Sequence, residues 1–130
     1  MAADILKIGG SVNPLKLEGP AELSRNLQIT TAALDATGFC LFIAFAILEQ
    51  PETLGAMVET ITHMYGLDMT GDDVVTLGQK ILKMEREFNE KAGFGPASNR
   101  LPRHFSREPL APHNVTFDVS EKELDSVYNF

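Results

Sequence analysis

Cysteine is nearly absent from this sequence, since one residue, Cys40, occurs among 130. A single cysteine excludes an internal disulfide framework and is typical of a reducing compartment. A long hydrophobic segment is also lacking, because the most apolar run, Phe39–Leu48, has about ten residues, half of what a membrane span needs. No secretory signal opens the sequence. These absences predict a cytoplasmic protein that does not enter a membrane.

Positive charge is in short supply as well, with 11 Lys and Arg residues against 18 Asp and Glu and a net charge of −7. Such a surface repels the phosphates of nucleic acids and of anionic lipids, so neither is an expected partner. Arg100, Arg103, His104 and Arg107 form a local exception. Prolines and Glu108 interrupt this segment, which indicates a solvated loop rather than a nucleic-acid-binding surface.

The motifs of a self-contained active site are missing too. The sequence contains no P-loop, no GxGxxG fingerprint and no HExxH motif. Its histidines lie far from Cys40 along the chain, and no four zinc ligands cluster. Asp68, Asp72 and Asp73 do not follow the EF-hand order and are typical of a helix cap. We therefore predict no catalytic residue within this chain.

What the sequence does contain is mostly helical pattern. Residues 21–33 are compatible with a helix, and residues 39–49 are apolar on nearly every side, which is typical of a buried helix. Residues 51–65 form an amphipathic pattern that stops at Gly66. A capping box at Thr70–Asp73 begins the clearest helix, which ends at Gly93. The expected inward positions of the last two helices are Leu54, Met57, Val58, Ile61 and Met64 or Tyr65, then Val74, Leu77, Ile81, Met84 and Phe88.

Four prolines between Phe94 and Val119 exclude a long helix and a central strand there. A connection of this length is too long for a casual loop, so we expect an extended strap lying over a partner surface. The expected anchors are Phe94, Leu101, Phe105, Leu110 and Phe117. A capping box at Ser120–Glu123 predicts a short final helix through Tyr128.

The predicted fold is therefore all-α. It is a compact bundle of about four helices with a long proline-rich extended strap and a short C-terminal helix. Glycines and prolines punctuate residues 1–20 too often for a long helix, so this part is expected to be an irregular lead-in. Residues 21–130 are expected to form a single helical domain, a length typical of one domain.

One short segment, Asp35-Ala36-Thr37-Gly38-Phe39-Cys40, combines residue types that suit cofactor chemistry. A carboxylate accepts hydrogen bonds from the N–H groups of a pterin-like heterocycle, and Gly38 lets the backbone approach closely. A thiolate at a helix start is favoured by the helix dipole, as an iron ligand requires. The residues alone favour a simpler interpretation, in which Cys40 is a small hydrophobic residue buried in an apolar helix.

This segment resembles the second D-x-x-G-L-C-type motif of the tungsten- or molybdenum-pterin aldehyde ferredoxin oxidoreductases. A second resemblance runs from Gly78 through the Glu85-Arg86 pair to Gly93-Phe94, and continues into the strap at Leu101-Pro102. The two motifs agree in order and spacing, and the resemblance covers about residues 21–130. It identifies the domain as the C-terminal domain of a larger oxidoreductase.

The resemblance implies roles for particular residues. Asp35 corresponds to the pterin-binding carboxylate, with Phe39 and Leu41 in the same cofactor-binding segment, and Cys40 corresponds to one ligand of a 4Fe–4S cluster. Phe39 stands where the family usually has Leu, so its ring must be accommodated. Ser98 and Asn99 stand where many members carry paired acids, so no substrate role is assigned to the strap.

The resemblance also implies partners. A 4Fe–4S cluster takes four thiolates, and this chain has one. The other ligands, the tungsten- or molybdenum-bis-pterin and the catalytic groups belong with upstream domains, and ferredoxin accepts the electrons. The chain alone is therefore expected to bind no cofactor and to be inactive. An alternative is a non-catalytic helical interaction domain that forms a homo-oligomer through its exposed apolar helix.

Overall fold

The computed structural model describes residues 2–10, 12, 13, 15 and 19–130. In that part of the chain the fold is helical, without strands, and one bridge pairs Leu110 with Val115. The all-α prediction is confirmed. No helix of the described residues is long and apolar enough to cross a membrane. The elements are α1 (Ala2–Ile5), α2 (Pro20–Ala36), α3 (Ile43–Glu49), α4 (Pro51–Tyr65), α5 (Gly71–Lys91), the 3₁₀ turn η1 (Pro96–Ser98), α6 (His104–Arg107) and α7 (Glu121–Ser126).

The bounds of α4 and α5 follow their sequence signals. Pro51 begins α4, and Gly66 ends it in a left-handed conformation with φ of 65°. At the start of α5, the Asp73 carboxylate accepts hydrogen bonds from the Thr70 hydroxyl at 2.6 Å and the Thr70 N–H at 2.8 Å. These bonds, the hydroxyl one first, hold the pKa of Asp73 below its ordinary value. The capping box predicted at this position is confirmed.

Helix α2 makes its most extensive contact with α5. The two helices meet where Gly78 lies against the backbone of Ile29, so closely that a Cβ on Gly78 would overlap the Ile29 carbonyl oxygen. Helix α2 is longer than predicted at both ends, and it passes through Ile29 without a break. Burial of Ile29 and Ala33 offsets the weak helix propensity of the β-branched residues around them.

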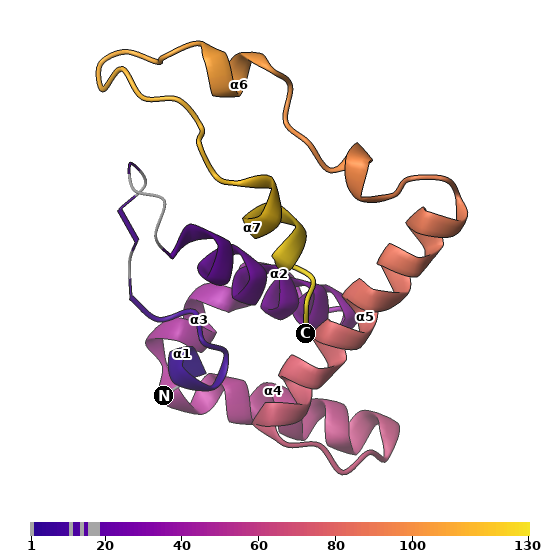
Figure 1. Cartoon of the computed structure of the whole chain (residues 1–130). Helices are drawn as coiled ribbons and strands as arrows, with labels where there is room; N and C mark the ends of the chain where they lie inside the picture. Colours follow the sequence, from indigo (N-terminus) through magenta and orange to yellow (C-terminus); the bar gives the residue numbers. More distant parts are fainter. Residues whose placement is uncertain (1, 11, 14, 16–18) are drawn as a thin grey trace.

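The core lies where α1–α4 meet the start of α5. The predicted α4 face is buried from Leu54 to Ile61, whereas Met64 and Tyr65 are exposed. On α5 the prediction holds for Val74 and fails for Met84 and Phe88, which are 70% and 73% exposed. The C-terminal end of α5 extends away from α4 (Figure 1).

The predicted irregular lead-in contributes to the core. Its short helix α1 places Ala2 in the buried cluster, and Leu6 follows it there. The parts of the lead-in at residues 1, 11, 14 and 16–18 lie outside the described residues.

The predicted buried helix over residues 39–49 is wrong in two respects. Helix α3 begins only at Ile43, and among its residues only Ile47 is buried. The described chain packs against one side of this apolar run, so the opposite side faces solvent. The exposed side chains are Leu41, Phe42, Phe45 and Leu48.

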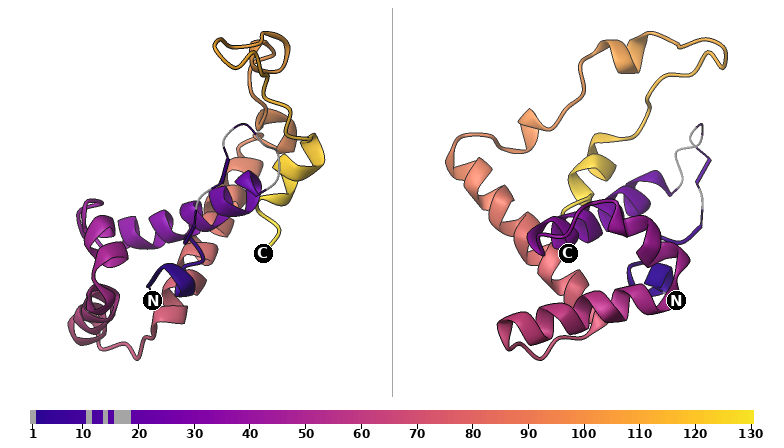
Figure 2. Two further views of the ribbon diagram at one scale, coloured as in Figure 1. Left: turned by 90° about the vertical axis from the view of Figure 1, so that its left-hand side faces the viewer. Right: turned by 180° about the vertical axis from the view of Figure 1, so that it is seen from behind.

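The strap, residues 94–119, leaves the end of α5, extends away from the helices and returns at α7 (Figures 1 and 2). All five expected anchors are exposed. Within this chain the strap contacts itself instead, because the Phe117 N–H donates to the Phe105 carbonyl oxygen at 2.8 Å. Ser120 caps α7 as predicted, accepting from the Glu123 N–H at 3.2 Å, but the helix ends at Ser126 rather than Tyr128.

Candidate functional site

The last turn of α2 and the segment that connects it to α3 hold all four residues that the sequence singled out. Helix α2 ends where the Thr37 hydroxyl donates to the Leu34 carbonyl oxygen at 2.6 Å. Gly38 follows in a left-handed conformation with φ of 78°, and no atom lies within 4 Å of where its Cβ would stand. The glycine therefore shapes the turn and leaves its outer side open to a ligand.

Asp35 lies in the last turn of α2 and is exposed. Its carboxylate has no hydrogen-bond or ion-pair partner among the described residues. It lines an open pocket of about 530 Å³ along α2 and α5, which we call the α2–α5 pocket. The polar and apolar walls of this pocket include Ser24, Gln28, Thr31 and Asp35 from α2, and Leu82 and Glu85 from α5.

Phe39, Cys40 and Leu41 are the next three residues after Gly38. Phe39 packs against the core, so its ring is accommodated, and Leu41 is 54% exposed. Cys40 is exposed, which contradicts the simpler interpretation of a buried small hydrophobic residue. It also lies three residues before α3, so the expected position at a helix start is wrong, and the dipole effect falls off beyond the first turn.

The residues of the turn fit part of a pterin and iron–sulfur site. An unpartnered carboxylate, an open glycine and an exposed thiol are the donors and acceptors that such groups require. No group of three or more His, Cys, Asp or Glu side chains within the described residues is arranged to hold a metal ion. Cys40 is the one cysteine of the sequence.

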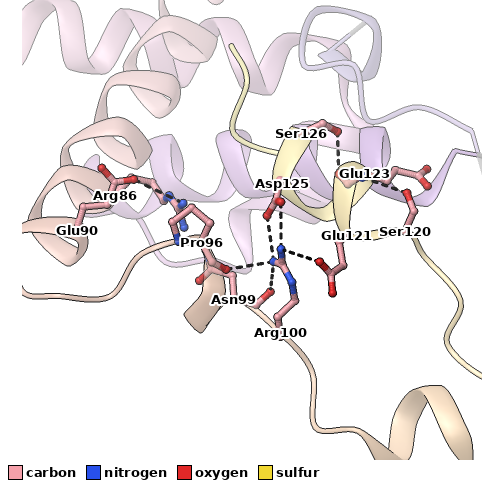
Figure 3. Close-up of polar contacts among 10 residues, drawn as sticks. All are labelled: Arg86, Glu90, Pro96, Asn99, Arg100, Ser120, Glu121, Glu123, Asp125 and Ser126. Atoms are coloured by element: carbon pink, nitrogen blue, oxygen red, sulfur yellow. Dashed lines mark hydrogen bonds and ion pairs between the residues drawn. The ribbon is translucent and has the colours of Figure 1, made fainter.

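Sequence reasoning missed a set of arginines that join distant segments. Arg100 donates to the Asp125 carboxylate at 3.0 Å and to the backbone oxygens of Pro96 and Asn99 at 3.1 and 3.0 Å (Figure 3). The bond to Asp125 raises the pKa of Arg100, with Glu121 at 3.8 Å adding to it. Arg100 is therefore a structural residue that closes the two ends of the strap, which a solvated-loop interpretation did not predict.

Arg25 makes the equivalent link from α2. Its Nε donates to the Val127 carbonyl oxygen and its Nη2 to that of Ser126, both at 2.9 Å. The sequence separation exceeds 100 residues, so no local pattern indicates this contact.

Comparison with known proteins identifies the family of this chain. Residues 2–130 match the family described as aldehyde ferredoxin oxidoreductase, domains 2 and 3. The chain belongs to the aldehyde ferredoxin oxidoreductase family. The resemblance inferred from the two motifs is thereby confirmed, and the match begins earlier than the expected boundary at residue 21.

Curated relatives agree with this assignment. The chain is 37% identical over 86 residues to the tungsten-containing aldehyde ferredoxin oxidoreductase of Pyrococcus furiosus and 36% identical over 86 residues to that of Thermococcus kodakarensis. The Pyrococcus horikoshii protein of the same name is 34% identical over 84 residues. Each match covers 64% of this chain and 13% of the relative. No solved structure matches the chain.

Proposed function

We propose that this chain is the cofactor-contacting C-terminal part of an aldehyde ferredoxin oxidoreductase. Asp35 accepts hydrogen bonds from the pterin of a tungsten or molybdenum cofactor, and Cys40 is one thiolate ligand of a 4Fe–4S cluster. The observation that carries the proposal is the placement of Asp35 and Cys40 at either end of one exposed turn, with both side chains free of protein partners within the described chain.

The reaction of the whole enzyme belongs to the same proposal. When bound, the metal–pterin and the cluster would supply the redox chemistry, in which an aldehyde and water give a carboxylic acid, two protons and two electrons that pass to ferredoxin. The chain's own residues orient and hold these groups. Phe39 supports the turn from the core, and Leu41 provides apolar surface beside it. The chain spans about 13% of its relatives' length, so upstream domains are the proposed source of the remaining ligands.

A sharp test uses the longest polypeptide that the gene encodes, produced anaerobically. Cys40→Ser is expected to lower its iron content and its cluster absorption, because a hydroxyl is a poor iron ligand. Ala36→Ser is the matched control, since it adds a hydroxyl to the same exposed segment and keeps the thiol. Iron content that is equal in both variants contradicts the ligand assignment.

A separate variant tests whether Asp35 binds the pterin. Asp35→Asn replaces an acceptor-only group with a mixed donor and acceptor, so tungsten or molybdenum content is expected to fall. Asp68→Asn, at an exposed acid beyond α4, is expected to leave the metal content unchanged. Equal metal content in the two variants would rule Asp35 out.

A second function is favoured by the exposed apolar residues around α3. Leu41, Phe42, Phe45 and Leu48 form an apolar face that the described chain does not cover. A helical domain that associates through this face explains the same exposure without a cofactor. A gene that encodes these 130 residues without upstream domains would favour this alternative, because the remaining cluster ligands would then have no source.

A further inference from the structure

The last residues of the chain pack against the two helices that form the α2–α5 pocket. We call residues 126–130 the C-terminal clasp. Tyr128 is its central residue, because its hydroxyl donates to Gln28 Oε1 on α2 at 3.0 Å. On the other side, the Arg86 guanidinium carbon on α5 lies 4.5 Å from the centroid of the Tyr128 ring. Tyr128 therefore contacts both helices at once.

Two further contacts hold the clasp in place. The bidentate Arg25 bonds fix the backbone of Ser126 and Val127 to α2. Lys83 on α5 lies 5.3 Å from the centroid of the Phe130 ring. Polar and cation–π contacts of this kind contribute modestly one by one, but together they attach the clasp to both α2 and α5.

The clasp is adjacent to the proposed cofactor residue. Gln28, which binds Tyr128, lies seven positions before Asp35, so both residues are on one face of α2. The structure places both in the wall of the α2–α5 pocket, and Glu85 in the opposite wall precedes the Arg86 that covers Tyr128. Helices α2 and α5 also contact each other directly, most closely where Gly78 lies against the backbone of Ile29.

We propose that Tyr128 is a positioning residue, which fixes the spacing of α2 and α5 along the pocket and thereby orients the helix end that carries Asp35. The consequence for Asp35 rests on the proposed function, whereas the effect of Tyr128 on the spacing of α2 and α5 does not. Its test has a readout that does not depend on any cofactor.

The test measures hydrogen–deuterium exchange of the 130-residue chain. Tyr128→Ala is expected to raise amide exchange in residues 28–36 of α2 about fivefold or more, while α4 changes little, because sub-global opening follows the lost local contacts. Tyr65→Ala is the matched control, since Tyr65 is the other tyrosine of the chain and is 61% exposed. Equal exchange of α2 in the two variants, or an equal rise in α4 and α2, overturns the proposal.

A milder pair of variants covers the case in which Tyr128→Ala does not fold. Tyr128→Phe keeps the ring over Arg86 and loses the bond to Gln28, so a rise of about two- to threefold in α2 exchange is expected. Adding Gln28→Leu to Tyr128→Phe is expected to add little, because the two changes remove the same bond. Fully additive effects overturn the assignment of Tyr128 to Gln28. If Cys40→Ser leaves the iron content unchanged, the proposed function fails while this result stands.

Discussion

Gly78 on α5 lies directly against the carbonyl oxygen of Ile29 on α2, with no space for a side chain between them. Gly78→Ala is therefore expected to destabilise the chain by about 1–3 kcal/mol, the usual cost of overpacking a close contact. The measurement is urea unfolding followed by circular dichroism. Gly55→Ala on α4 is the control, because no atom lies within 4 Å of its added Cβ, and it is expected to stabilise by roughly 0.5–1 kcal/mol. If Gly78→Ala stabilised the chain as Gly55→Ala is expected to, the close contact between Gly78 and Ile29 would be contradicted.

The Thr70–Asp73 cap predicts a pH dependence of stability. The folded-state pKa of Asp73 is lowered, so the ionised carboxylate stabilises the fold above the unfolded pKa of about 3.9. This stabilisation is lost as the pH falls through the lower, folded value. Thermal unfolding measured between neutral pH and pH 3 is expected to be less acid-sensitive in Asp73→Asn than in the unmodified chain.

Asp72→Asn is the control for that experiment. Asp72 lies in the same first turn of α5 but does not accept the Thr70 hydrogen bonds. The acid sensitivity of this variant is expected to match that of the unmodified chain. Identical behaviour of Asp72→Asn and Asp73→Asn would show that the cap is not the cause.

The ends of the strap are joined by Arg100, which leads to a prediction for proteolysis. Arg100→Gln removes the ion pairs to Asp125 and Glu121, so the strap is expected to be cleaved about fivefold faster by thermolysin. The control is Arg103→Gln, whose guanidinium group has no partner among the described residues. Cleavage at the same rate in both variants would contradict the role of Arg100 in closing the strap.

The apolar face around α3 predicts self-association of the isolated chain. Phe42 and Phe45 are 76% and 62% exposed, with ring centroids 6.0 Å apart. Phe42→Ser combined with Phe45→Ser is expected to weaken association by about tenfold or more in sedimentation equilibrium, because each ring loses its burial in the interface. Phe94→Ser, at an exposed aromatic residue of the strap, is expected to change it little.

Local signals in the sequence were sufficient for the bounds of α4 and α5. Pro51, Gly66, the Thr70–Asp73 box and Gly93 act within one helical turn, so their effect does not depend on the rest of the fold. Gly38 was expected to let the backbone approach a ligand closely, and its left-handed conformation also forms the turn after α2.

The missed features depend on tertiary contacts. Periodicity marks Met84 and Phe88 as inward-facing, but it does not say whether a neighbouring helix reaches that part of α5. The same holds for the apolar run at residues 39–49. Its composition indicates that it would be stable when covered by protein, but it does not show whether this chain supplies that cover. The contacts of Arg25, Gln28 and Tyr128 were not predicted, since their partners lie about 100 residues away along the chain.

The separation of about 100 residues between α2 and the clasp means that the two are synthesised at different times. Arg25 and Gln28 emerge early, whereas the residues that bind them follow about 100 positions later. At elongation rates of roughly 5–20 residues per second, the residues that bind Arg25 and Gln28 are synthesised on the order of 5–20 s after α2. A nascent chain that is interrupted within the strap therefore lacks the hydrogen bonds from residues 126–128 to α2.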